Sequence, residues 1–218
     1  MPAENPLVRR AVRTGGVLLA VAAAQFVVVA LWVGSRLPGY DLWSGSLGGL
    51  RSAGAPWNLL FDASLLTLGA VAALGLLFSW SAFDERPSRG LGLLALLVAS
   101  VAAAVAGAFA LLGARVPTPG FPWATNVAFG AAGVGLLITA FAMHRHERWR
   151  VSRAYTFASG LVVLVGFALA LVHPIGLAPS TLVRIAAASA LLWALVEGLH
   201  IALLHRFAPG LQVKVATA

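Results

Sequence analysis

The chain has 218 residues, of which 60% are hydrophobic and 10% are charged, and it contains no cysteine. Without cysteine, disulfide bonds, thiolate nucleophiles and cysteine metal sites are excluded. The formal net charge of +8 does not indicate nucleic acid, because the basic residues flank apolar segments, where they fix topology and attract anionic lipid headgroups.

Six apolar segments follow one another along the chain, each about 20 residues long and therefore able to cross a bilayer. The pattern predicts an all-α polytopic membrane bundle of six transmembrane helices over residues 16–34, 58–80, 91–113, 123–143, 154–173 and 181–204. No segment between them is long enough for a soluble domain. We therefore expect residues 1–218 to form a single transmembrane domain.

The basic residues also predict the orientation of the chain. With the N-terminus inside, eleven of the fifteen lysine and arginine residues lie on the cytoplasmic side and four on the external side, as the positive-inside rule requires. Both termini are then cytoplasmic, residues 206–218 form a cytoplasmic tail, and the protein is a multi-pass protein of the cell membrane, the inner membrane in a bacterium.

The first span has one alternative. Three arginines precede it and Ala22-Ala23-Ala24 lies within it, a pattern that a signal peptidase accepts. The apolar run continues to Trp32, which is longer than a typical signal core. We expect the first helix to be retained.

Residues 35–57 are the longest segment between spans and are predicted to form an external cap. Glycines and Pro38 divide the segment into turns, and its apolar side is made by Tyr40, Leu42, Trp43, Leu47 and Leu50. We expect the cap to fold over the bundle or to lie on the membrane surface, and we regard it as a candidate lid.

Two short motifs carry a resemblance. They are Tyr40-Asp41-Leu42-Trp43-Ser44-Gly45-Ser46-Leu47-Gly48, followed by Gly54-Ala55-Pro56, and Gly120-Phe121-Pro122-Trp123. Both resemble a six-span bacterial membrane family known only as a domain of unknown function. The resemblance implies the six-span fold and no activity. The chain departs from the family at Ser46, where an Asp is common, and at Trp123 and Asn126, where a His is common.

Packing between the spans is predicted to rely on small residues, since close approach of backbones replaces the hydrophobic force in lipid. We expect Gly69, Gly130, Gly133 and Gly135 to be packing positions.

Asp62 and Glu197 are the first candidate site residues, because a charged side chain at membrane depth costs several kcal/mol unless it is paired, neutralised or beside a cavity. Asp62 shares a helical stripe with Asn58. It either has a structural role, as the ion-pair partner of Arg184 or as a cap for a loop backbone, or it is kept neutral as a proton donor in a largely dry pocket. Further candidates at a similar depth are Asn126, His173 and Arg184.

Glu197 shares one helix face with Trp193 and His200. The three side chains suit a proton relay or a ligand pocket, and the alternative is a Glu197–His200 pair that only joins helices. Gln25 is the expected partner from another helix. Because Asp62 and Glu197 differ in depth by more than roughly 15 Å, we expect one elongated lipophilic cavity with an acid near each end.

Aromatic side chains suit the walls of such a cavity, and Phe61, Trp123 and Trp193 are the candidates. For Trp57, Trp80 and Trp123 the interfacial aromatic belt is the better interpretation. No metal or cofactor is predicted, since the His144-Arg145-His146-Glu147 cluster lies in a basic loop that repels cations.

Three functions remain open. The first is an enzyme that cyclises a lipophilic isoprenoid by proton transfer, with Asp62, Glu197 and His200 as catalytic residues. In having acids in an early and a late span, the chain is similar to the small integral-membrane terpene cyclases. The second is a lipid- or quinone-binding accessory subunit without catalysis, and the third is a proton-coupled transporter. The expected partner is in each case a lipophilic small molecule or a lipid.

Overall fold

The computed structural model describes residues 6–41, 45–51, 55, 57–80, 87–112, 122–143, 150–172 and 178–207. None of them lies in a β-strand. The elements are α1 (Pro6–Arg36), the short 3₁₀ helix η1 (Leu47–Arg51), α2 (Asn58–Ser79), α3 (Pro87–Leu111), α4 (Pro122–Ala142), α5 (Arg150–Val172) and α6 (Pro179–Phe207). All six α-helices are long and apolar enough to cross a membrane, which confirms the predicted all-α, six-span bundle.

The helix boundaries differ from the predicted spans mainly in α1. It begins ten residues before the apolar segment, at Pro6. Helical hydrogen bonding does not stop where the lipid ends, and Arg, Leu and Ala are all good helix formers. Apolarity therefore located the spans but not the full lengths of the helices.

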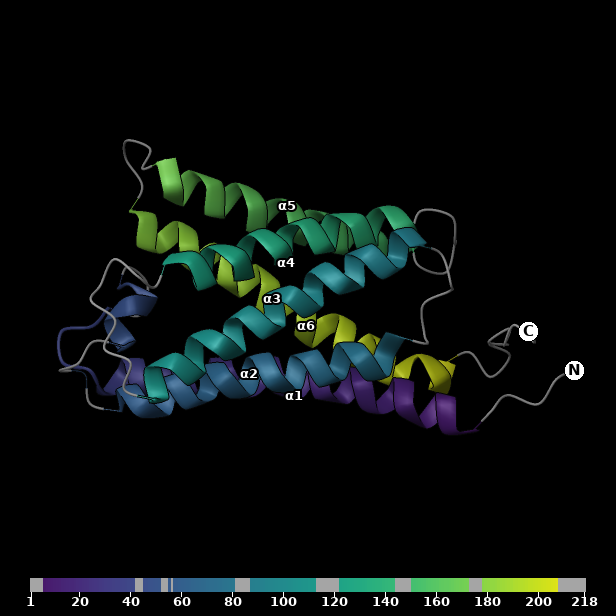
Figure 1. The fold of residues 1–218 in the computed structure, drawn as a ribbon, viewed down its shortest axis with the longest axis horizontal. Coiled ribbons are helices and arrows are strands. Elements are labelled where there is room, and N and C mark those ends of the chain that lie inside the picture. The colour runs from purple at the N-terminus through teal and green to yellow at the C-terminus, as the bar shows by residue number, and fades with distance from the viewer. Residues whose placement is uncertain are drawn as a thin grey trace, which may run out of the picture.

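The six helices close into a ring. Each helix packs against the next one in the chain, and α6 packs against α1 (Figure 1). In Figure 1, α3 and α6 run diagonally in opposite senses across the other helices. The start of α1 and the end of α6 lie at one end of the bundle, and η1 lies at the other.

Glycines set the closest helix contacts. A Cβ atom on Gly198 of α6 would lie 2.7 Å from the carbonyl oxygen of Gly16 in α1, and one on Gly69 of α2 would clash with the backbone of α3. Gly133 and Gly135 are packed equally closely, against α5 and α3. The prediction for Gly130 is wrong, since no atom lies within 4 Å of the position a Cβ would take.

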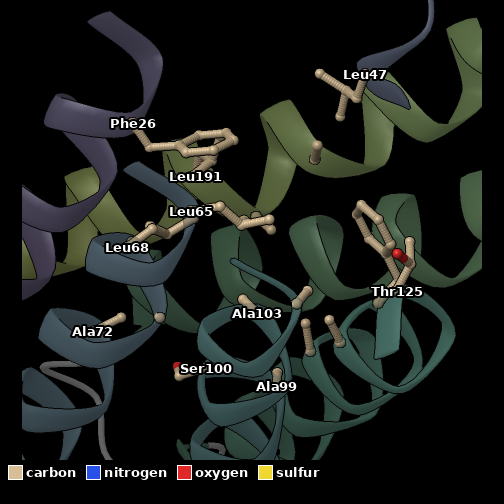
Figure 2. Close-up of a pocket in the computed structure, with 18 of the residues that line it drawn as sticks. Phe26, Leu47, Leu65, Leu68, Ala72, Ala99, Ser100, Ala103, Thr125 and Leu191 are labelled. Atoms are coloured by element: carbon tan, nitrogen blue, oxygen red, sulfur yellow. The ribbon is translucent and has the colours of Figure 1, made fainter. Parts of the chain in front are cut away.

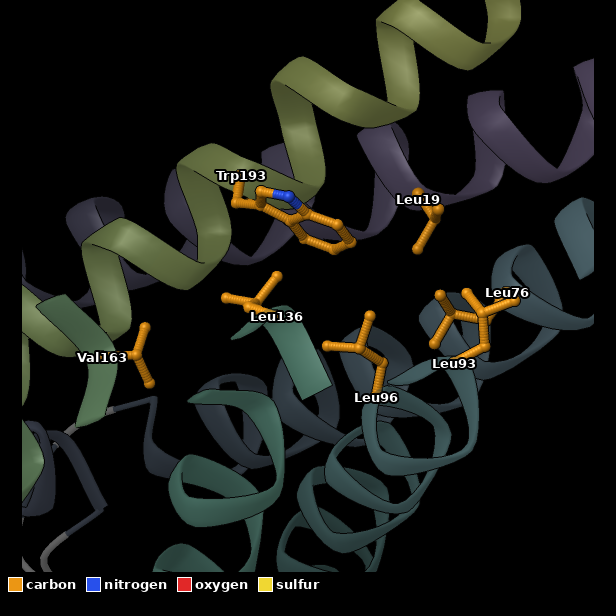
Figure 3. Packing of buried hydrophobic residues seen from close by; sticks show 7 residues of the cluster. All are labelled: Leu19, Leu76, Leu93, Leu96, Leu136, Val163 and Trp193. Atoms are coloured by element: carbon orange, nitrogen blue, oxygen red, sulfur yellow. The ribbon is translucent and has the colours of Figure 1, made fainter. Parts of the chain in front are cut away.

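A buried apolar cluster receives side chains from all six helices and lies inside the ring (Figure 3). It consists of Leu19, Leu76, Leu93, Leu96, Leu136, Val163 and Trp193. Five of these seven are Leu, which packs in lipid through van der Waals contact alone. A cavity lies beside this cluster, on the side of η1.

Candidate functional site

A cavity of about 430 Å³ lies inside the ring between the apolar cluster and η1. Its walls come from α1, α2, α3, α4, α6 and the cap, and most of the side chains in them are Ala, Leu and Phe (Figure 2). Along α6 the lining extends from Ser180 to Ala194, which is roughly 20 Å of helix. The size lies within the range of about 300–1,000 Å³ that small-molecule sites occupy.

The two ends of the cavity differ in polarity. Ser46, Arg51, Thr125 and Ser180 line the end beneath the cap, and Arg51 is the one charged residue in the lining that the structure describes. The opposite end is formed by Leu76, Leu96, Leu136 and Trp193. In Figure 2, Leu47 and Thr125 lie toward one side of the pocket and Leu68 and Ala72 toward the other. The cavity is thus apolar at its deep end and polar at the end beneath the cap, which we call its mouth.

The cap folds over this mouth and is held by apolar packing. Leu50 is almost fully buried, in a cluster with Phe26, Val33 and Phe61 from α1 and α2. Leu37, Tyr40 and Leu47 pack against the same cluster. Of the two placements predicted for the cap, over the bundle or on the membrane surface, the described residues adopt the first.

Arg51 fastens the cap to α2 and α3. Its Nε donates to Asp62 Oδ1 over 2.6 Å, and its Nη2 donates to the backbone oxygen of Ala106 over 3.0 Å. The side chains of Arg51 and Asp62 are 19% and 6% exposed. This short and largely buried contact is a charge-assisted hydrogen bond, which ties the cap to α2.

The predicted pairing of Asp62 with Arg184 is therefore wrong. The cap folds back onto the start of α2, and this brings Arg51, eleven residues away in the sequence, within reach of the carboxylate. Sequence reasoning missed Arg51 because its position depends on the fold of the cap rather than on helical spacing.

Arg184 instead contacts Tyr40 of the cap. Its guanidinium donates a hydrogen bond to the Tyr40 hydroxyl and lies 5.2 Å from the centre of the Tyr40 ring. The Tyr40 hydroxyl in turn donates to the carbonyl oxygen of Ser46. Burial raises the pKa of Tyr40 above its ordinary value, although the neighbouring Arg184 opposes the rise. Tyr40 is therefore neutral at pH 7 and does not balance the charge of Arg184.

Glu197 belongs to a separate polar cluster between α5 and α6. Its Oε2 lies 3.1 Å from His200 Nδ1, as expected from their spacing, and accepts a hydrogen bond of 3.2 Å from Ser152 Oγ. Ser152 Oγ also lies 2.9 Å from His200 Nδ1. Neither Glu197 nor His200 lines the cavity.

Gln25 is not the partner of Glu197, contrary to our prediction. Its Nε2 donates to the backbone oxygen of Ser64 in α2 over 3.0 Å. The helix that faces Glu197 is α5, and its contributing residue, Ser152, carries no sequence signal because serine is common in packed membrane helices.

Trp193 lies at the floor of the cavity, one helical turn before Glu197. Its indole N–H donates to Thr156 Oγ1 over 3.0 Å, while the ring lines the cavity. The indole is thereby fixed in place, and its polar atom is directed away from the apolar floor.

The other candidate residues occupy different positions. Phe61 lines the cavity with its ring centre 5.5 Å from that of Phe26. The Asn58 side chain accepts a hydrogen bond from the backbone N–H of Leu59 at the start of α2. His173 lies outside the described residues, as does the cluster of His144 to Glu147.

Trp123 and Asn126 are exposed on the outside of α4 and are not part of the cavity lining. The face of α4 that lines the cavity carries Ala124, Thr125 and Ala128 instead. Small residues leave space, whereas the conspicuous Trp and Asn side chains do not. The 55% exposure of Trp123 agrees with the aromatic-belt interpretation.

The arrangement can hold an elongated apolar molecule with one polar end, and it has no carboxylate in the cavity wall among the described residues. Comparison of the chain with protein families, with curated proteins and with solved structures gives no significant match.

Proposed function

We propose that this integral membrane protein binds an elongated lipophilic molecule, an isoprenoid or an acyl chain, in the cavity beneath the cap. The single observation that carries the proposal is the lining of the cavity, which is apolar over its length and has its charged residue only at the mouth. An apolar ligand gains about 25 cal/mol for each Å² of its surface that such a wall covers. The bilayer itself supplies molecules of this kind.

Proton-initiated cyclisation of an isoprenoid would use the same cavity, but the positions of the three predicted catalytic residues weigh against it. The reaction needs a neutral acid at the substrate. Asp62 is ion-paired with Arg51, and Glu197 and His200 contact each other behind the cavity floor. Binding without catalysis, the accessory-subunit hypothesis, is therefore the function that we favour.

The transporter hypothesis also receives less support. Secondary transporters bind their substrates at helices that are broken near the bilayer midplane. Here α1, α2 and α6, which contribute to the cavity, each run as one uninterrupted helix.

A cavity-filling variant tests the proposal. Ala103 of α3 lines the cavity, whereas Ala70 of α2 is exposed on the outside of the bundle. We would purify the wild type, Ala103→Phe and Ala70→Phe in detergent and add farnesol, geranylgeraniol or a long-chain fatty acid. A ligand at about 100 times its Kd adds about 2.7 kcal/mol of stability, which raises Tm by roughly 5–10 °C in a chain of this size.

We expect at least one of these ligands to raise the Tm of the wild type and of Ala70→Phe, and to leave the Tm of Ala103→Phe unchanged. The same samples are analysed by mass spectrometry for isomers of the added isoprenoid. Equal shifts in all three proteins would refute the cavity as the binding site. Isomeric products formed by the wild type would restore the cyclase hypothesis.

A further inference from the structure

Two arginines, Arg51 and Arg184, lie at or beside the mouth of the cavity, and they differ in their partners. Arg51 and Asp62 neutralise each other, whereas Arg184 contacts only the uncharged Tyr40 within the described part of the chain. The Arg184 Nε atom is buried and has no hydrogen-bond partner there. A charged side chain in a membrane helix is costly unless it is paired, and such a residue commonly marks a functional site.

Arg184 lies next to the cavity. It follows Val183 and occupies the same face of α6 as Ser180 and Ala187, four residues before it and three after it, and all three of these line the cavity. Ser46, whose carbonyl oxygen accepts from Tyr40, lines the cavity from the side of the cap. Arg184 therefore lies beside residues of α6 that line the cavity, and Tyr40 connects its side chain to Ser46 in the cap.

We propose that the ligand is an acidic amphiphile, with a phosphate or carboxylate headgroup that pairs with Arg184 at the mouth and a tail that extends toward Trp193. This inference rests on the proposed function. The headgroup supplies the acceptor that Arg184 Nε lacks and pairs with the guanidinium charge. Arginine binds such oxygens with charge-assisted hydrogen bonds, and the apolar floor excludes the opposite orientation.

Two amphiphiles that share one tail test this inference. We would measure the Kd of geranylgeranyl phosphate and of geranylgeraniol for the purified wild type, Arg184→Gln, Arg184→Lys and Arg36→Gln, with inorganic phosphate alone as a third probe. Arg36 is the matched control, because it is an exposed arginine at the same end of the bundle and lies over the Trp32 ring.

We expect the wild type and Arg36→Gln to bind the phosphate at least about tenfold more tightly than the alcohol. In Arg184→Gln this preference disappears while the affinity for the alcohol is unchanged, and in Arg184→Lys it falls only in part, since the charge remains. Inorganic phosphate at millimolar concentration neither binds nor competes.

Equal affinity of the wild type for the two amphiphiles would overturn the headgroup inference and leave the proposed function intact, and this comparison holds even if the Arg184 variants fold poorly. No binding of either amphiphile would overturn the proposed function as well. Binding of inorganic phosphate as tightly as the phosphorylated lipid would overturn the inference that the anion is a lipid headgroup, and would indicate a site for a free anion.

Discussion

Loss of the Asp62 carboxylate is predicted to destabilise the protein strongly. In the Asp62→Ala variant, Arg51 stays largely buried and keeps its hydrogen bond to Ala106, but it loses its short contact with the Asp62 carboxylate. Removal of one partner from a buried ion pair costs about 3–5 kcal/mol. For a chain of this length the loss corresponds to a Tm that is lower by roughly 6–20 °C.

A double-mutant cycle separates the ion pair from the other contacts of each residue. We would measure Tm in detergent by intrinsic fluorescence for Asp62→Leu, Arg51→Met and the double variant. The double variant is expected to melt near the wild type, because replacement of a buried pair by apolar side chains of similar size is often neutral. Arg36→Met is the control and should have an effect within about 0.5 kcal/mol, as is usual for an exposed residue.

The reasoning is refuted if Asp62→Ala melts like the wild type, or if the effects of the two single substitutions simply add in the double variant. Either result would mean that the contact between cap and α2 contributes no coupling energy, and that apolar packing alone fastens the cap.

Further predictions concern the packing, the cap and the second polar cluster. Gly69→Ala should lower Tm because the new methyl group meets the backbone of α3, whereas Gly130→Ala should raise it slightly, since a helical alanine in open space is favoured by about 0.5–1 kcal/mol. In Tyr155→Phe, which leaves Tyr40 as the remaining tyrosine, the midpoint of the tyrosinate absorbance should lie above pH 10.0, because burial raises the pKa of Tyr40. Tyr40 ionises at a lower pH in the unfolded chain than in the folded one, so stability falls as the pH rises above 10.0. A tyrosinate midpoint at or below pH 10.0 would contradict this. Glu197→Ala should cost about 1–3 kcal/mol, because it removes the buried oxygen that contacts Ser152 and His200; this is measured as a lower Tm, and Glu197→Gln should cost less.

The six spans were predictable from the sequence because a bilayer imposes both a length and a composition on each helix. Contacts within one helix were also predictable, because the helical repeat fixes which side chains share a face. The positions of Glu197 and His200, three residues apart, place both side chains on one face whatever the neighbouring helices do.

Contacts between elements were not predictable in the same way. Asp62 was expected to pair with an arginine, but the partner depends on how the cap turns back over α2, and no periodicity describes that turn. The face of α4 that lines the cavity was missed because it is marked by small residues such as Ala124 and Ala128. Sequence reasoning favours side chains that can form contacts, whereas a cavity forms where side chains are small.

The amount of lipid that purifies with the protein tests the central claim most directly. We would extract the wild type, Ala103→Phe and Ala70→Phe from the same membranes in a mild detergent and determine the moles of each bound lipid per mole of protein by mass spectrometry. Our account predicts a lipophilic molecule near one mole per mole in the wild type and in Ala70→Phe, and its loss in Ala103→Phe. The same content in all three proteins, or none in the wild type, would contradict it.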